Sequence, residues 1–518
     1  MLNTNSKIKV LATLSMGLLA LNFFAAQSSA KNADLLIENV TLISAERSQP
    51  LNHASVLIRN GEIIEVSGQS ISKKIDTVGK GIEVIDGTGR FLIPGLMDSH
   101  VHVSNMPGAP FKYQDDPVLT KLVDQFHQQQ PRSYLYFGVT QVLDPSQSAE
   151  SITRFNRAIE KPDLFHCGAI PIFRGYPALY VTDEEAASIF DFILADKDAD
   201  HQHSNFSYPK HFNPQEHTPE KLVAKIAKDG AICVKVFIED GFGSQSHWPL
   251  IAKSALERIR KAADKHGLKM VAHANAIDMQ TIALEVGVDV IAHGMWNWNQ
   301  YDGQKGLPQP IKNIADKIVS SHTTYQATFG VMDGLKGVML PETLNKLLLT
   351  YVVPAQTLDW YRSEQGQWFH REMKSDYGDI PLETIHRYQD LNIGQGERVL
   401  AYLDQQNHPL VLASDTPAAP TYAQQPGYST YMELRHMHKI GISLSRIFAA
   451  ATLNNAKQFN LDNHYGSIEP GKKANLLLLE ENPLNTIEAY NSISQVVLGG
   501  KVIDRNSLSV KSLEISKD

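Results

Sequence analysis

Two histidines two residues apart, His100 and His102, follow an apolar segment typical of a buried strand. The apolar residues are 91–97, and Asp98 and Ser99 separate them from the pair. Side chains at i and i+2 of a strand point to the same side. Both imidazoles can therefore bind one metal ion, and imidazole is a preferred ligand for zinc and its neighbours. Asp98 shares this face, where it either orients an imidazole or forms part of a turn.

Spacing alone does not identify a metal site, because 20 histidines in 518 residues give about one such pair by chance. Two further pairs occur. His201 and His203 lie in a polar stretch, residues 196–208, that we predict to be a loop. His436 and His438 lie in a helical pattern, where neighbours two apart do not face each other, and we expect them on the helix surface.

Composition describes an ordinary globular protein. Hydrophobic residues make up 42% of the chain, charged residues make up 20%, and the net charge is −8. No basic stripe indicates binding to nucleic acid, so we expect a small-molecule substrate. The length allows one large barrel domain with an appendage or three ordinary domains.

The first thirty residues are typical of an export signal. Lys7 and Lys9 precede a mostly apolar run, residues 10–26, and small residues at 28–30 offer a cleavage site. The run is too short and too interrupted for a stable membrane span. We therefore predict a signal peptide at 1–30 and an exported protein, in the bacterial periplasm or secreted.

The only two cysteines, Cys167 and Cys233, both lie in apolar, strand-like segments. Export permits a disulfide, but buried cysteines more often serve as small hydrophobic side chains. We therefore favour two unpaired cysteines.

Both ends of the mature chain carry short strand patterns separated by turn signals such as Asn60-Gly61. The patterns at 34–43, 54–58, 63–66 and 82–86 resemble those at 474–479 and 494–503. We predict that residues 31–90 and 466–518 form one small β-sandwich domain around the rest of the chain.

Between the two ends, eight apolar runs alternate with helical patterns, which indicates parallel strands. The runs cover residues 92–97, 140–143, 168–173, 232–238, 269–272, 288–292, 323–329 and 409–413. We predict an α/β fold in which residues 91–465 form a (β/α)8 TIM barrel. A helical insertion at about 340–405 is expected to cover the pocket.

Reactive groups of such a barrel belong at the C-terminal ends of its strands. The polar residues at these ends are His100, His102, Lys235, His273, His293 and Asp415. Lys235 is the most informative, because residues around it are apolar and a buried ammonium group tends to lose its proton. The neutral amine can take up CO2 to form a carbamate that bridges two metal ions. The sequence supports equally well that the Lys235 side chain extends from the strand end to water.

These motifs resemble the amidohydrolase superfamily, in the metal-dependent branch with imidazolonepropionase-like and Xaa-Pro dipeptidase-like members. The resemblance covers nearly the whole mature chain. It is carried by residues 93–102, by the valine-lysine-valine strand at Lys235, by His273, His293 and Ser414-Asp415, and by the C-terminal segments 466–476, 482–484 and 499–502. Asn475 stands where the family usually has aspartate.

The resemblance implies two divalent metal ions, with zinc as the expected metal. It implies that His100, His102 and Asp415 hold one ion, that His273 and His293 hold the other, and that N6-carboxylated Lys235 bridges both. It also implies hydrolysis by a hydroxide that bridges the ions, with Asp415 as the catalytic residue that moves its proton to the leaving group. The resemblance leaves open whether the protein forms a homo-oligomer.

The expected reaction is cleavage of the amide bond of a small substrate such as a dipeptide or an N-acyl amino acid. Esterase, lactonase and phosphotriesterase activities use the same kind of site. A mononuclear deaminase needs a carboxylate near the fifth-strand histidine, and residues 273–276 offer none. A metal-binding protein without catalysis would be expected to lack Asp415 or Lys235.

Loops after the strands supply candidate pocket residues, each of which can also be ordinary loop packing. Arg174 can anchor a substrate carboxylate. The other candidates are Tyr113, Tyr176, Trp296 and Trp298.

Overall fold

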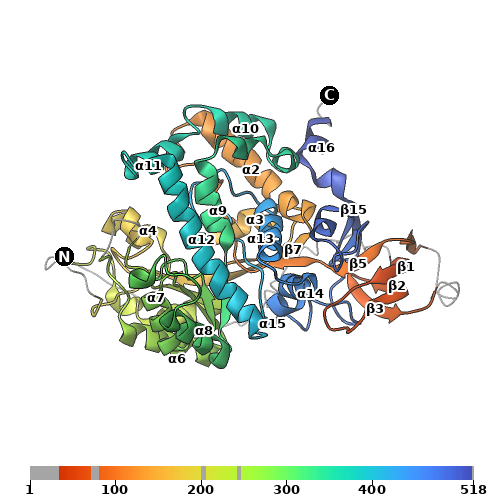
Figure 1. The fold of residues 1–518 in the computed structure, drawn as a ribbon, viewed down its shortest axis with the longest axis horizontal. Helices are drawn as coiled ribbons and strands as arrows, with labels where there is room; N and C mark the ends of the chain where they lie inside the picture. Colours follow the sequence, from red (N-terminus) through yellow and green to blue (C-terminus); the bar gives the residue numbers. More distant parts are fainter. Residues whose placement is uncertain (1–33, 72–80, 147, 200–205, 242–246, 516–518) are drawn as a thin grey trace, which may run out of the picture.

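The computed structural model describes residues 34–71, 81–146, 148–199, 206–241 and 247–515. Figure 1 shows a mixed α/β protein in which a small sheet lies to one side of a larger helix-covered part. The predicted export signal at 1–30 and the pair His201 and His203 lie outside the described residues. Among the described residues, no helix is both long enough and apolar enough to cross a membrane.

The small sheet joins the two ends of the chain. Its N-terminal strands are β1 (Leu35–Leu42), β2 (Leu51–Arg59), β3 (Glu62–Ser67), β4 (Glu83–Asp86) and β5 (Phe91–Pro94), and its C-terminal strands are β13 (Leu476–Leu479), β14 (Ile493–Leu498) and β15 (Lys501–Asp504). β13 pairs antiparallel with β5, so that Leu476 faces Pro94. Residues more than 380 positions apart in the chain thus lie side by side.

The strands at the two ends form one sheet of eight in the described residues, so the predicted two-sheet sandwich is not confirmed. The cause lies in β1. It pairs with β2 along one edge, and along its other edge it pairs with β4 and then with β5. One strand thereby connects what would otherwise be two layers.

The larger part contains a parallel sheet of seven strands in sequence order, which confirms the α/β class. The strands are β6 (Leu96–Asp98), β7 (Val139–Asp144), β8 (Asp163–Ile170), β9 (Cys233–Phe237), β10 (Lys269–His273), β11 (Val290–Ala292) and β12 (Thr324–Gln326). Parallel order brings the C-terminal ends of all seven strands to one edge of the sheet.

Helices follow most of these strands. They include α2 (Pro117–Tyr136), α3 (Ala149–Asn156), α4 (Asp183–Ile189), α5 (Pro219–Lys228), α6 (Lys253–His266), α7 (Ile277–Val286), α8 (Gln309–Ser321) and α9 (Phe329–Val338). Gly267 and Gly287 end α6 and α7 in the left-handed conformation, which glycine adopts without strain. The chain can therefore turn directly into β10 and towards β11.

The first predicted barrel strand, residues 92–97, is divided at Gly95 in the structure. β5 belongs to the small sheet, whereas β6 begins the parallel sheet. A Cβ at Gly95 would lie 1.8 Å from Thr140 Oγ1. Only glycine fits where the chain passes from one sheet to the other.

The eighth predicted strand, residues 409–413, is not a strand in the structure. Its carbonyls accept side-chain amides, since Asn454 donates to Leu410 O and Asn455 donates to Leu412 O. The segment nevertheless runs beside β6, since Ser99 N also donates to Leu412 O and Val101 and Thr416 form an isolated parallel bridge. The closed eight-stranded barrel is therefore not confirmed.

Residues 340–405 form short 3-10 turns followed by α10 (Ala355–Arg362), α11 (Trp368–Asp376) and α12 (Leu382–Gln405). Tyr361 Oη donates to Pro107 O at 2.7 Å, and Trp368 Nε1 donates to Gly108 O at 2.8 Å. These helices thus lie on the loop that follows His102.

The remaining helices are α13 (Tyr428–Lys439), α14 (Leu444–Ala449), α15 (Asn455–Gln458) and α16 (Val510–Ile515). On α13, His438 is exposed but His436 is buried. The ring of His436 stacks on Phe329 of α9, with centroids 4.1 Å apart. The surface prediction is therefore wrong for His436, because α9 covers that side of the helix.

Cys167 and Cys233 form a disulfide, so the prediction of two unpaired cysteines is wrong. They face each other in the register of the parallel strands β8 and β9. Both side chains are buried, and Lys235 follows Cys233 by two residues on the same side of β9. The bond ties together two strands just below the lysine.

We expect removal of this disulfide to lower the free energy of unfolding by about 2–4 kcal/mol, because the closed loop restricts the unfolded chain. Chemical denaturation of the Cys167→Ala/Cys233→Ala protein beside wild type measures the difference. Mass spectrometry after thiol labelling of unfolded, unreduced wild type is the control. Two labelled thiols there would contradict the pairing.

Candidate metal centre

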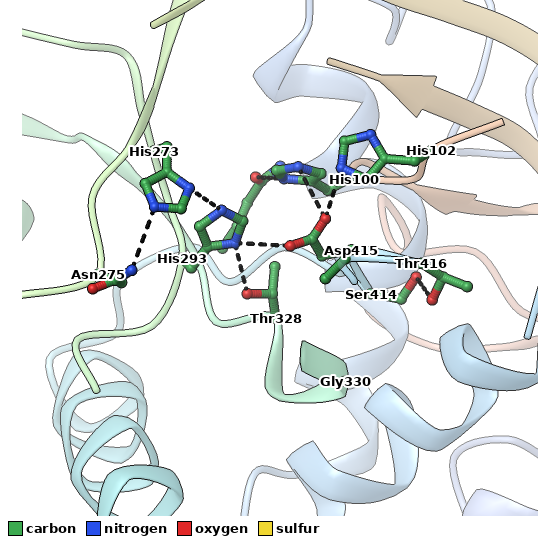
Figure 2. Close-up of polar contacts among 12 residues, drawn as sticks. His100, His102, His273, Asn275, His293, Thr328, Gly330, Ser414, Asp415 and Thr416 are labelled. Atoms are coloured by element: carbon green, nitrogen blue, oxygen red, sulfur yellow. Dashed lines mark hydrogen bonds and ion pairs between the residues drawn. The ribbon is translucent and has the colours of Figure 1, made fainter. Parts of the chain in front are cut away.

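The structure brings the six predicted strand-end residues into one cluster. His100 and His102 follow β6, Lys235 lies in β9, His273 ends β10, and His293 follows β11. Asp415 ends the segment beside β6 that carries Ser414. Figure 2 shows the Asp415 carboxylate between His293 on one side and His100 and His102 on the other. His102 is partly exposed and the other five side chains are buried.

His100, His102 and Asp415 form the first group of potential ligands. One nitrogen or oxygen atom from each lies within 4.8 Å of the others. Nε2 of His102 lies 2.9 Å from Asp415 Oδ1, and Nε2 of His100 lies 3.4 Å from the same oxygen. Asp415 Oδ1 is nevertheless buried without a hydrogen bond of acceptable geometry among the described residues. Its position suits a shared cation better than a proton.

The orientation of His100 is set by Gln326 at the end of β12. Gln326 Nε2 donates to Ser99 O and Ser99 Oγ, each at 3.0 Å. Its other amide atom, Oε1, therefore faces His100 Nδ1 at 2.9 Å and accepts from it. The Nε2 lone pair of His100 is left pointing at the Asp415 carboxylate, which repels it.

His273 and His293 form the second group, with Nδ1 of the first 3.0 Å from Nε2 of the second. The far side of each ring meets an oxygen. His273 Nε2 lies 2.9 Å from Glu239 Oε2. His293 Nδ1 lies 3.0 Å from Thr328 Oγ1 and 3.2 Å from Asp415 Oδ2.

These partners determine where the protons of the two rings lie. A carboxylate accepts only, so the Glu239 contact requires the proton of His273 on Nε2, and the Asp415 contact requires that of His293 on Nδ1. In the neutral form of both rings, the two nitrogens that face each other then carry lone pairs. Lone pairs 3.0 Å apart repel unless a cation lies between their directions. The donor set therefore fits a metal ion here as well.

Burial and charge perturb these groups strongly. Burial lowers the pKa of His100 to about 3, against the opposing effect of Asp415. Burial also lowers the pKa of His293 well below its usual value. For His102 burial acts in the same direction, but Asp144 and Asp415 outweigh it and raise the pKa to about 9. Two of the imidazoles are thus neutral, the form that binds metal.

Lys235 is buried, with Nζ 5.8 Å from the centre of the Phe237 ring. Burial lowers its pKa to about 8, although Asp415 and Asp144 favour the charged form. The amine is therefore much closer to its neutral, nucleophilic form than an exposed lysine.

Two buried aspartates support the first group. Asp98 accepts the backbone N–H of His100 at 3.2 Å and of Ser414 at 3.0 Å, so it ties the two ligand-bearing segments together and has the turn role. Asp144 accepts the backbone N–H of Val103 at 2.7 Å. It also lies 3.5 Å from His102 Nδ1.

The sequence analysis missed Glu239, Gln326 and Thr328. Glu239 follows β9 by two residues, and its carboxylate is buried against His273 and Asn275, whose Nδ2 donates to it at 2.7 Å. Residues 273–276 offer no carboxylate, as the sequence shows, but Glu239 brings one to His273 from another segment. The carboxylate comes from the preceding strand, and its position four residues after Lys235 was the available signal.

The candidate pocket residues differ in their surroundings. Tyr176 and Trp296 adjoin the centre, with rings 5.0 Å from His273 and 5.7 Å from His293. Trp298 is fully buried, and its Nε1 donates to Met295 O, as in ordinary packing.

Arg174 and Tyr113 are engaged within their own loops. Arg174 binds Asp183 through Nε and Nη2, at 3.1 and 2.7 Å from Oδ2. The carbonyl of Tyr113 accepts the N–H of Asp116, in the turn that starts α2. Their roles towards a substrate remain predictions.

Known proteins resemble this chain in sequence. A model of the amidohydrolase family matches residues 393–503. An imidazolonepropionase from Alkaliphilus metalliredigens is 22% identical over 86% of this chain and 89% of its own length. An adenine deaminase from Desulforamulus reducens is 36% identical over 14% of this chain, and the chain spans only 11% of that protein.

A solved structure resembles it in fold. The crystal structure of a Xaa-Pro dipeptidase with methionine bound in its active site has a TM-score of 0.60 and 18% sequence identity, and it covers 91% of this chain and 100% of its own. At this identity the likeness concerns the fold.

We expect Glu239→Gln to weaken binding of one metal ion by about 10–100-fold. A glutamine amide can donate as well as accept a hydrogen bond, so it no longer fixes the His273 proton on Nε2. Zinc titration against a competing chelator measures this without a substrate. Asp240→Asn is the matched control, since that carboxylate is the next residue in the chain. Equal affinities in both variants would contradict the role given to Glu239.

Proposed function

We propose that this chain, which belongs to the amidohydrolase superfamily and is a hydrolase of carbon–nitrogen bonds, cleaves the amide bond of a small substrate such as a dipeptide or an N-acyl amino acid, with two divalent metal ions. The observation that carries the proposal is that His273 Nδ1 and His293 Nε2 face each other at 3.0 Å while the far nitrogen of each ring lies beside a carboxylate. The second unsatisfied group, Asp415 Oδ1, supports a second ion close by.

The distances between the candidate ligands divide them into two groups, one for each ion. His100, His102 and Asp415 would hold one, and His273 and His293 would hold the other. When bound, such ions supply an activated water as nucleophile and polarise the scissile carbonyl. Zinc is the metal we propose, because imidazole and carboxylate are ligands that suit it.

Lys235 supplies the anionic link between the two groups. Its neutral amine adds to the carbon of CO2 and loses one proton, which leaves an N6-carboxylated lysine with two oxygen ligands and one negative charge. Together with Asp415 this charge offsets part of the repulsion between two cations. The burial of Lys235 supports the assignment, because a buried neutral amine is the reactive form.

Asp415 is the proposed catalytic residue. Its Oδ1 faces His100 and His102, whereas its Oδ2 lies 3.2 Å from His293. A carboxylate between the two groups can take the proton of the attacking water and pass it to the leaving nitrogen. Tyr176 and Trp296 would form the walls against which the substrate packs.

We also propose that the protein is exported, to the periplasm or beyond. The N-terminal sequence is the main support. The disulfide between Cys167 and Cys233 adds to it, because such bonds persist in oxidising compartments.

We expect Lys235→Ala to lose one of two metal ions and to lower kcat by about 100-fold or more, because the bridging anion is gone. Elemental analysis and steady-state assays with dipeptides and N-acyl amino acids measure both. Lys269→Ala is the matched control, since that lysine lies on the neighbouring strand and pairs with Asp289 outside the centre. Full metal content and activity in Lys235→Ala would refute the bridging role.

A second candidate function is deamination, and Glu239 is the observation that favours it. Its carboxylate lies 2.9 Å from the ring of His273, where a deaminase needs an acid to protonate the substrate. In an amide hydrolase the same carboxylate only orients the imidazole.

A substrate screen separates the two candidates. We expect turnover of dipeptides or N-acyl amino acids and no release of ammonia from adenine or 5-methylthioadenosine. Esters and lactones serve as comparison substrates for the same nucleophile. Ammonia release that is lost in Glu239→Gln, together with no cleavage of any amide, would favour the deaminase.

A further inference from the structure

A buried glutamate outside the set of candidate ligands holds the beginning of α9. Glu433 on α13 accepts the N–H of Phe329 through Oε1 at 3.0 Å and the N–H of Gly330 through Oε2 at 2.9 Å. These are the first two residues of α9, whose N–H groups have no partner within the helix. A carboxylate at this end is also favoured by the helix dipole.

Thr328, the residue before α9, has an unusual backbone conformation. Its φ is 46° and its ψ is 47°, a left-handed geometry that is rare for a β-branched residue. Such a conformation persists only where the surroundings hold it. Thr328 is fully buried, and its hydroxyl lies 3.0 Å from His293 Nδ1 (Figure 2). Glu433 therefore holds Phe329 and Gly330 in place. These two residues follow Thr328, whose hydroxyl contacts His293.

The same turn of α9 also lies against the segment that carries Asp415. A Cβ added to Gly330 would lie 2.7 Å from Ser414 O, so the two backbones are in close contact. Figure 2 shows Gly330 and Thr328 beside His293 and Asp415. A shift of the first turn of α9 would thus reach a ligand of each group.

Burial disfavours the charged form of the Glu433 carboxyl group. Burial raises its pKa to about 8, although His436 and the two backbone N–H groups favour the carboxylate. His436 lies between Asp333 and Glu397, at 3.0 and 2.9 Å. An acid that only filled space between α9 and α13 would need neither the two backbone N–H groups nor a histidine held by two carboxylates.

We propose that Glu433 is a positioning residue for the metal centre, which acts through Thr328. By holding the first turn of α9 it keeps the Thr328 hydroxyl on His293 Nδ1, and so it directs the other nitrogen of that ring towards His273. The inference rests on the proposed two-metal function, and it adds a residue outside the ligand set.

A double-mutant cycle on zinc affinity tests this proposal without any substrate. The variants are Glu433→Gln, Thr328→Val and their combination, each titrated against a competing chelator. We expect each single variant to weaken one of the two ions by about 10–100-fold. The loss of zinc affinity in the combined variant should be much smaller than the product of the two single losses, because both substitutions act on the same contact.

Three control variants sharpen the test. Thr328→Ser keeps the hydroxyl and is expected to bind zinc like wild type. Glu397→Gln removes the negative charge beside His436 but leaves α9 anchored, so it is also expected to bind both ions. Glu433→Asp keeps the carboxyl group but is too short to reach both N–H groups, and it is expected to weaken the same ion as Glu433→Gln.

The outcomes are distinguishable. Wild-type affinity in both Glu433 variants, or losses that multiply fully in the double variant, would overturn the positioning role. A loss in Glu397→Gln equal to that in Glu433→Gln would also overturn it, since general loosening of the helices would then be the cause. Failure of the wild-type protein to bind two ions would instead refute the proposed function.

Discussion

The centre of this protein depends on buried nitrogen lone pairs that face each other or face a carboxylate. His273 and His293 each have an oxygen partner on the far side of the ring, so in the neutral form of both rings the nitrogens on the near side, 3.0 Å apart, carry lone pairs. His100 presents a lone pair to Asp415 for the same reason. Protonation would relieve the repulsion, but burial makes charged imidazoles costly at His100 and His293. Cations at these two positions would relieve the repulsion without that cost.

The surrounding fold serves to maintain this arrangement. Parallel strands bring ligands from distant parts of the chain to one edge, and a layer of polar groups behind them orients the rings. Glu239 comes from the end of β9, Gln326 from the end of β12, and Thr328 from the start of α9. Asp415 and Thr328 both have positive φ angles, of 53° and 46°. Strained backbone of this kind is typical of sites that the rest of the structure holds in place.

The sequence could place the candidate ligands in one cluster because each follows or ends an apolar run, and the run alone locates the end of a strand. It could also predict the α/β class from the alternation of strands and helices. It could not predict Gln326 opposite His100 or Glu433 opposite Gly330, because these pairs are 226 and 103 residues apart and no local pattern links them. The division at Gly95 and the contacts of Asn454 and Asn455 with residues 410–412 likewise arise between distant segments. The pairing of Cys167 with Cys233 depends on the register of β8 and β9, which apolar runs do not specify.

An anomalous-diffraction map of the zinc-loaded protein, collected on both sides of the zinc absorption edge, tests the two-metal centre. We expect two peaks, one beside His273 Nδ1 and His293 Nε2 and the other among His100, His102 and Asp415. Continuous density from Lys235 Nζ to both peaks would mark the carboxylated side chain. A single peak, or no peak beside the facing nitrogens of His273 and His293, would rule out a two-metal centre of this kind.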